Sequence, residues 1–205
     1  MDSYRIPTKS GASEYVDKRS RFLGLVQPVG SEDEARAVIA ACKKQYHDAR
    51  HNCWCYLLRD GTERYSDDGE PAKTAGTPAL EVLQHSGLTD LIVVITRYFG
   101  GVLLGTGGLV RAYTTATSRA LEAAKVVTVR SVVALDVTVD YGLYERADLL
   151  IKAAGGKLAE PEFTDKVTLR WQMPEHTEGP LLTQLQELTR GTANVTVSEP
   201  FYAAF

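Results

Sequence analysis

The residues best placed to do chemistry lie in a glycine-rich segment between Phe99 and Gly108. It contains Gly100, Gly101, Gly105, Gly107 and Gly108, with Thr106 among them. The segment follows a strand predicted from Leu91 to Thr96 and precedes a helix predicted from about Leu109 to Ala124. Because glycine adopts conformations closed to other residues, successive main-chain amides of such a loop can point at one anion. The spacing matches neither the P-loop nor the dinucleotide fingerprint, so tight turns and close helix packing stay open as alternatives.

Two arginines and a tyrosine flank this loop. Arg97 and Tyr98 end the preceding strand, and Arg111 falls in the first turns of the following helix. Guanidinium groups bind phosphate and carboxylate through paired hydrogen bonds. We therefore expect an anion to be held between the arginines and the loop amides, with pairing of an arginine to an acidic loop as the alternative.

That acidic loop is the irregular segment between Ser66 and Thr77, which contains Asp67, Asp68 and Glu70. Three carboxylates can bind a hard cation or act as an acid/base pair. The spacing does not fit an EF-hand, and turn residues that cap local amides give the same composition. Long irregular loops within compact domains are often functional, so the loop remains a candidate site.

His51, Cys53 and Cys55 alternate along a predicted strand and therefore share one face. Zinc binding and a Cys/His nucleophile are the chemical interpretations. Structural zinc sites use wider spacing and a second ligand pair, which favours simple packing of the small thiols. The sequence also contains none of the common hydrolase or metalloprotease signatures. We predict no catalytic residue, no metal site and no cofactor.

Near the N-terminus, Lys18, Arg19 and Arg21 form a basic run beside Phe22. Cations next to an aromatic ring can bind single-stranded RNA. Charged residues also protect edge strands from aggregation.

Length and patterning predict two domains, residues 1–130 and 131–205, in an α+β fold. The second has the order strand, helix, two strands, helix, strand of a ferredoxin-like domain. The first carries 17 Lys and Arg against 15 Asp and Glu, a net +2, and the second 6 against 11, a net −5. This balance excludes binding of nucleic acid through overall charge, so any RNA contact must come from a local patch. The lack of a long apolar stretch or apolar leader, with three cysteines, predicts a soluble cytoplasmic protein.

Several longer motifs together resemble the signature of the IMPACT family, in its bacterial YigZ branch. They are Lys18–Phe22, Ala49–Cys53, Ser66–Pro71, Thr74–Gly76 with Pro78, Arg97–Gly101 and Leu104–Leu109. The resemblance implies a first domain with the left-handed βαβ fold of the second domain of a small-subunit ribosomal protein and of domain IV of elongation factor G. It implies a second domain like domain V of that factor. Lys73 stands where the family usually has glycine.

The resemblance also implies a function, namely a translation-associated regulatory or accessory protein. It would bind RNA, the ribosome or a ribosome-associated protein, with no membrane contact, and its oligomeric state stays open. The expected binding residues are Lys18, Arg21, Lys73, Arg97, Tyr98, Arg111 and the glycine loop, with His51, Asp67, Asp68, Glu70 and Thr74 as a second candidate group. A phosphate- or nucleotide-handling enzyme and a pure protein-interaction regulator are the alternatives.

Overall fold

The computed structural model describes residues 3–205, which divide into two compact units. One comprises Tyr4–Thr128, and the other comprises Val129–Phe205 with Ser3. Each combines a largely antiparallel sheet with helices, so the α+β class is confirmed. None of the helices in this part of the chain is long and apolar enough to cross a bilayer.

The first unit is built on a five-stranded sheet in which all neighbouring strands are antiparallel. The strand order is β2 (Gly11–Asp17), β3 (Ser20–Pro28), β6 (Leu91–Tyr98), β4 (His51–Leu57) and β5 (Glu63–Ser66). Strand β1 (Ser3–Lys9) pairs instead with β7 (Lys125–Val139). β6 is central and buried on both faces, as its run of β-branched residues predicts.

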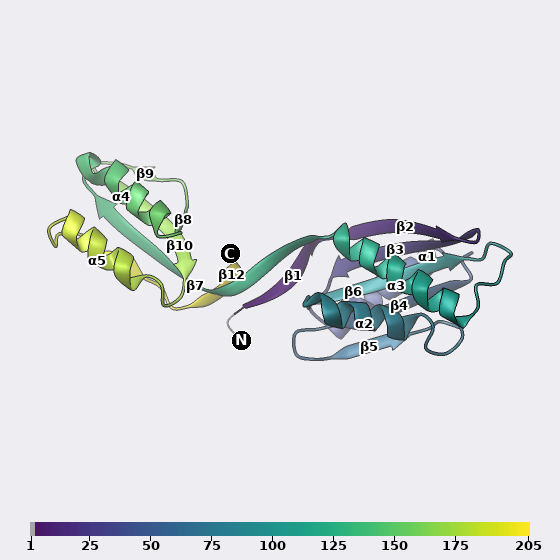
Figure 1. The fold of residues 1–205 in the computed structure, drawn as a ribbon. Coiled ribbons are helices and arrows are strands. Elements are labelled where there is room, and N and C mark those ends of the chain that lie inside the picture. Colours follow the sequence, from purple (N-terminus) through teal and green to yellow (C-terminus); the bar gives the residue numbers. More distant parts are fainter. Residues whose placement is uncertain (1–2) are drawn as a thin grey trace. The chain divides into compact units, whose positions relative to one another are not determined.

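Helices cover both faces of this sheet (Figure 1). Helix α1 (Glu32–Gln45) packs on one face against Ile92 and Val94, whereas α2 (Gly76–Ser86) and α3 (Thr106–Glu122) pack on the other against Val93 and Ile95. The spacing of Ser31 and Glu34 in the sequence predicts a capping box at the start of α1, and the structure confirms it. Ser31 Oγ accepts a hydrogen bond from the Glu34 amide at 3.2 Å, and the Glu34 carboxylate accepts one from the Gly30 amide at 2.7 Å.

Two boundaries differ from the sequence-based expectation. In the sequence the segment from Glu14 to Val29 reads as one extended strand, but the chain forms a hairpin whose two turn residues are Lys18 and Arg19, at φ 43° and 68°. Such turns usually contain glycine or asparagine, so this one carried no recognisable signal. Helix α3 also begins at Thr106, three residues earlier than predicted. The last part of the glycine loop is therefore the first turn of α3.

The second unit has the ferredoxin-like strand order. After β7 come α4 (Tyr141–Ala153), β8 (Lys157–Leu158), β9 (Glu162–Phe163), β10 (Val167–Pro174), α5 (Gly179–Leu188), β11 (Val195–Val197) and β12 (Phe201–Ala204). Strands lie in the order β11, β7, β10, β8, all antiparallel. Both helices contribute to a single core with one face of the sheet (Figure 1). β12 was not predicted.

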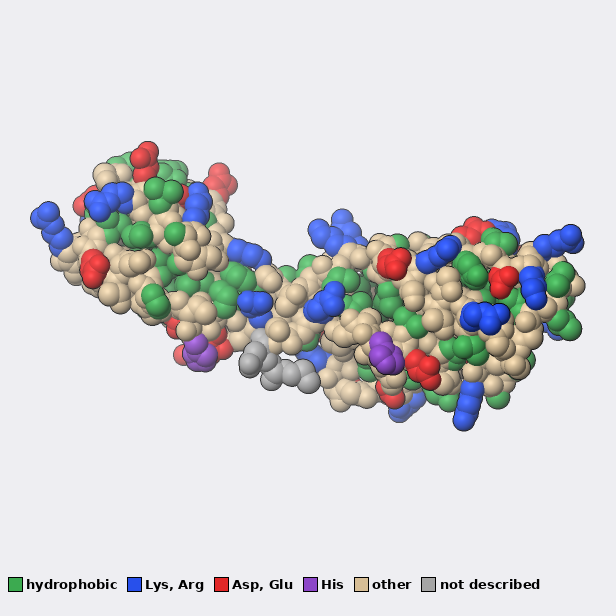
Figure 2. Space-filling model, viewed as in Figure 1, with side chains coloured by type: hydrophobic (Ala, Val, Ile, Leu, Met, Phe, Trp, Pro, Cys, Tyr) green, Lys and Arg blue, Asp and Glu red, His purple; other side chains and the backbone are tan. Residues whose placement is uncertain are grey.

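Lys and Arg side chains do not gather into one patch on the face that Figure 2 shows. They are scattered among acidic and apolar side chains on both units. On that face, any nucleic-acid contact would depend on a small local site rather than on a broad basic surface.

Candidate functional site

A cavity of about 450 Å³ lies where β4, β6, the acidic loop and the glycine loop meet. Its lining comes from four separate segments of the first unit. They supply Arg50, His51, Gly69, Glu70, Pro71, Arg97, Phe99, Leu103, Leu104, Gly105, Thr106 and Leu109. Of the residues singled out in the sequence, the structure thus brings together His51, Glu70, Arg97, Gly105 and Thr106. The cavity joins the two loops that the sequence treated as separate candidates.

Glu70 lies at the floor of the cavity, and its side chain is 3% exposed. Its Oε1 accepts a hydrogen bond from Arg97 Nη1 at 2.6 Å and another from the Tyr113 hydroxyl at 2.8 Å. Burial raises the pKa of Tyr113, which keeps the phenol neutral and able to donate. The pairing of Arg97 with the acidic loop is the alternative that the sequence had left open, and breaking such a buried pair costs about 3–5 kcal/mol.

Neighbouring side chains hold the Arg97 guanidinium in place. Its guanidinium lies 5.5 Å from the ring centre of Phe22 and 5.7 Å from that of Phe99, and Nη2 donates to Ser20 Oγ at 3.4 Å. The side chain is only 6% exposed, yet its buried Nε–H has no acceptor within residues 3–205. An unpaired buried donor costs about 1–3 kcal/mol, which makes Arg97 a group that a ligand can satisfy.

His51 faces Glu70 across the cavity floor. Its Nδ1 lies 2.8 Å from the carbonyl oxygen of Asp68, and because a carbonyl only accepts, Nδ1 must carry the proton. In the neutral ring Nε2 is then an acceptor, and it lies 3.8 Å from Glu70 Oε2. That distance is too long for a hydrogen bond. With the ring neutral, two acceptors face each other, and a donor placed between them would satisfy both.

The glycine loop forms the mouth of the cavity. Between Gly101 and Gly108 the main-chain amides donate to no acceptor within the described residues. The first three amides of α3 lack partners because no side chain caps this helix. Gly105, Thr106 and Gly107 are exposed, so the amides are accessible to a ligand. The partial positive charge of a helix N-terminus favours an anion at this place.

The glycines of this loop are there for different reasons. A Cβ at Gly100 would lie 2.1 Å from the carbonyl carbon of Arg19, and one at Gly108 would lie 2.9 Å from Leu104 Cβ. Gly101 and Gly105 have φ of 82° and 74°, which other residues rarely adopt. Gly107 has neither constraint, since a Cβ there would meet nothing within 4 Å. The fold explains four of the glycines but not Gly107.

Arg50 and Phe99 were missed by sequence reasoning. The Arg50 guanidinium lies 5.5 Å from the centre of the Phe99 ring, at the edge of the cavity. Arg50 is exposed and has no carboxylate within ion-pair distance in the described chain. The two residues are neighbours only because β4 pairs with β6, with His51 opposite Arg97. No local motif could have shown this.

Three other residues of the acidic loop stabilise its conformation through hydrogen bonds. Asp67 accepts the amides of Lys73, Ala75 and Gly76 at 2.8–3.0 Å, and so caps the start of α2. Asp68 accepts hydrogen bonds from the amide of Asn52 at 2.7 Å and from the ammonium of Lys43 at 2.6 Å. Thr74 Oγ1 donates to the Pro71 carbonyl at 2.6 Å.

Lys73 has φ 61° and an exposed side chain. That backbone conformation favours glycine over other residues. Lys73 does not line the cavity.

The remaining predicted binding residues lie outside the cavity lining. Lys18 is in the β2–β3 turn, and Arg21 pairs with Glu14 at 2.8 Å. The Tyr98 hydroxyl donates to Asp48 at 2.9 Å. Arg111 is exposed on α3 without an ion pair in residues 3–205. The structure therefore does not unite these four residues with the glycine loop in one pocket.

Cys53 and Cys55 are buried in the core against α2 and α3. Burial raises the pKa of both thiols, so neither forms a reactive thiolate near neutral pH. Cys53 donates to the Asp67 carbonyl at 3.0 Å. The thiols pack and position the acidic loop, and no cluster of potential metal ligands forms within the described residues.

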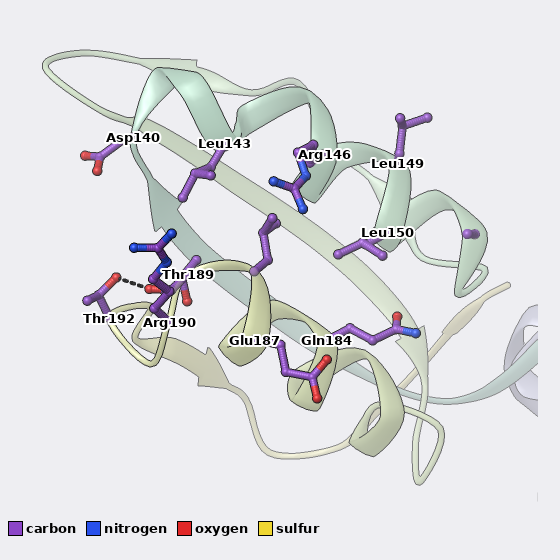
Figure 3. Close-up of a pocket in the computed structure, with 12 residues that line it drawn as sticks. Asp140, Leu143, Arg146, Leu149, Leu150, Gln184, Glu187, Thr189, Arg190 and Thr192 are labelled. Carbon is purple, nitrogen blue, oxygen red and sulfur yellow. Dashed lines mark hydrogen bonds between the residues drawn. The ribbon is translucent and has the colours of Figure 1, made fainter.

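A groove of about 950 Å³ lies in the second unit between α4 and α5 (Figure 3). Leu143 and Leu150 point from α4 towards α5, whereas Leu149 points away. Arg146 and Arg190 share this groove with the carboxylates of Asp140 and Glu187. Its charges are mixed, and none of the residues predicted as sites contributes to it.

Comparison with known proteins matches both units to family models. Residues 18–121 match the Impact N-terminal domain, and residues 137–192 match a domain of unknown function, DUF1949. The IMPACT family member YvyE of Bacillus subtilis is 33% identical over 98% of this chain and 94% of its own length. The IMPACT family member YigZ of Escherichia coli is 31% identical, over 97% of this chain and all of its own length.

Two further likenesses differ in extent. The Protein IMPACT of Rattus norvegicus is 28% identical over 51% of this chain and 34% of its own length. A crystal structure of a hypothetical protein is 29% identical, with a TM-score of 0.62 over 97% of this chain and 98% of that one.

Proposed function

Because the chain belongs to the IMPACT family, we propose that it is a translation-associated regulatory or accessory protein that acts by binding. Its partner would be RNA, the ribosome or a ribosome-associated protein. The match to a eukaryotic Protein IMPACT covers about half of this chain, which points to the first unit as the part that carries the shared role.

One observation supports a binding role most directly. The exposed main-chain amides of Gly105 and Thr106 have no acceptor within the described residues, and they line the same cavity as the Arg50 guanidinium. Exposed amides at a helix N-terminus bind phosphate without distinguishing base sequence. RNA phosphate is therefore the ligand that this surface fits best. The net charge of the chain, −3, means that recognition would rest on this local site.

The test places a negative charge among these amides. At Gly107 a side chain has room, and a glutamate in the first turn of a helix is tolerated. We expect Gly107→Glu to remove most co-sedimentation with purified ribosomes, because the carboxylate repels phosphate. Gly107→Gln, which has the same shape and no charge, is the matched control and should retain more binding.

Salt and nuclease treatment separate the possible partners. Binding to RNA phosphate weakens as the KCl concentration rises, with a slope that reports the number of phosphates contacted. A partner captured equally well after nuclease digestion would favour the protein-interaction regulator. Failure of the wild-type chain to sediment with ribosomes or bind RNA at low salt would refute the RNA and ribosome proposals.

A phosphate-handling enzyme is the second candidate, and it is favoured by the facing pair of His51 Nε2 and Glu70 Oε2 inside the cavity. Such a pair can take up and release a proton during hydrolysis. This candidate predicts phosphate release from a phosphate ester that His51→Ala abolishes. No release from a panel of phosphate esters would remove it.

A further inference from the structure

The cavity behind the glycine loop has the size and lining of a small-molecule site. Its volume of about 450 Å³ lies within the range of about 300–1,000 Å³ that is usual for ligand pockets. Pro71, Phe99, Leu103, Leu104 and Leu109 provide an apolar wall. Such a wall suits the flat, weakly polar face of a ring better than it suits a fully hydrated ion.

The polar groups at the floor are arranged for a ligand that donates and accepts. Glu70 Oε2 accepts no hydrogen bond from the described protein, and His51 Nε2, which is an acceptor in the neutral ring, lies 3.8 Å from it. These two atoms call for hydroxyl or amino donors. The buried Nε–H of Arg97 calls for an acceptor. Sugar hydroxyls and base edges of a nucleoside carry both kinds of group.

The anionic end of such a ligand has only one favourable place. At the floor Arg97 is already paired with Glu70 and offers an anion little net charge, whereas the mouth offers the first amides of α3 and the Arg50 guanidinium. A phosphate would therefore lie at Gly105 and Thr106, with the nucleoside pointing inward. Arg97 also lines the cavity, and its buried Nε–H has no acceptor within the described residues.

We propose that this cavity binds a phosphorylated ribonucleotide, either a free nucleoside monophosphate or the terminal nucleotide of an RNA. A terminal phosphate has three acceptor oxygens and carries nearly two charges at neutral pH. An internal phosphodiester offers two oxygens and one charge, so it satisfies the amides and Arg50 less completely. The RNA form of this proposal rests on the proposed function, and the free-nucleotide form does not.

The experiment measures binding of the full chain by calorimetry. The ligands are short single-stranded RNAs of one sequence with a 5′-phosphate, a 3′-phosphate or only hydroxyl ends, together with the four nucleoside monophosphates, adenosine and inorganic phosphate. We expect one terminal phosphate to strengthen RNA binding at least about tenfold, which corresponds to about 1.4 kcal/mol. A nucleoside monophosphate should compete, while adenosine and inorganic phosphate each bind more weakly.

Two exposed arginines give a matched pair of variants. Arg50→Ala removes a charge from the cavity edge, and Arg111→Ala removes one from the same unit outside the cavity. We expect Arg50→Ala to weaken nucleotide binding about tenfold and Arg111→Ala to change it less than twofold. Both positions are exposed, so both variants should fold. Equal effects would show generic electrostatic attraction and overturn the proposal.

The outcomes separate this proposal from the proposed function. If RNA binds equally with and without terminal phosphates and no monophosphate competes, the cavity proposal fails although RNA binding stands. If monophosphates bind and RNA does not, the cavity proposal stands in its free-nucleotide form and the RNA proposal fails. If none of the nucleotides or RNAs binds, both fail.

Discussion

Gly100 and Gly107 lie seven residues apart in one glycine loop, yet the structure assigns them opposite sensitivities to the same small change. A Cβ at Gly100 would lie 2.1–2.4 Å from main-chain atoms of Arg19 and Ser20, whereas one at Gly107 has open space around it. Neither residue has a positive φ. Replacement of each by alanine therefore tests the space around the new methyl group, without the strain that a positive φ would add.

The expected magnitudes follow from these contacts. Since unbonded carbon atoms sit about 3.5–4 Å apart, Gly100→Ala forces the turn back by about 1 Å or more. Overpacking of this kind costs about 1–3 kcal/mol. The movement also breaks the hydrogen bond from the Gly100 amide to Ser20 Oγ, now 3.2 Å, which is worth about 1 kcal/mol. We expect a total loss of about 2–4 kcal/mol in the free energy of unfolding.

Gly107→Ala should raise the free energy of unfolding slightly instead of lowering it. Alanine is favoured over glycine within a helix by about 0.5–1 kcal/mol, and the first turn will realise the lower part of that range. The variant should be at least as stable as the wild type. If Gly107 serves ligand binding, its methyl group will weaken that binding while the fold gains stability.

The assay uses the separate tryptophans of the two units, Trp54 in β4 and Trp171 in β10. In a Trp171→Phe background, urea unfolding followed by fluorescence reports the first unit alone. With a slope of about 1–3 kcal/mol per molar urea, Gly100→Ala should lower the midpoint by about 1–2 M. Midpoints of Gly100→Ala and Gly107→Ala that agree within error would refute the reasoning.

Three further predictions concern the loops and α1. Asp67→Ala removes a carboxylate that accepts hydrogen bonds from three amides, and it should lower the free energy of unfolding of the first unit by about 2–4 kcal/mol in the same urea assay. Asp67→Asn keeps one acceptor oxygen and should lower it by less. Lys73→Gly relieves the strain of a φ of 61° and should raise the free energy of unfolding of the first unit by about 0.5 kcal/mol. The gain is this small because glycine also raises the conformational entropy of the unfolded chain. Burial, with a hydrogen bond to Glu32, raises the pKa of Tyr56 to about 12. Its contribution to stability is therefore complete below pH 10 and lost as the pH rises towards 12, and Tyr56→Phe should abolish that step in a pH series of unfolding midpoints.

Much of the fold could be predicted because its signals are local. The capping box at Ser31 and the β-branched run of β6 each arise within a few residues. So does the Asp60–Gly61 pair, which in the sequence predicts the turn between β4 and β5. The β2–β3 hairpin was missed because it has no such local signal. Its turn residues Lys18 and Arg19 adopt positive φ, although neither residue type favours that conformation. Their conformation is maintained by packing of the turn against Gly100, a contact that spans about eighty positions in the chain.

The candidate site shows the same limit more sharply. The sequence identified the glycine loop and Glu70, but each could be read as binding or as structural. The pairing of β4 with β6 places Arg50 against Phe99. The contacts of His51 and Asn52 with Asp68 bring the acidic loop to β4, and so place His51 against Glu70. The strand pairing depends on hydrophobic contacts throughout the sheet, so no spacing rule could have assembled the cavity.

Arg97 shows why a residue's type does not fix its role. The sequence allowed two roles for it, anion binding or pairing with the acidic loop, and the two were treated as alternatives. In the structure Nη1 bonds Glu70 while Nε, on the same guanidinium, has no partner in the described residues. The ion pair neutralises most of the charge that Arg97 would offer an anion, so attraction at the mouth must come from Arg50 and the amides of α3. The buried pair then contributes directional donors and acceptors rather than charge, which is a basis for selecting one small ligand over another.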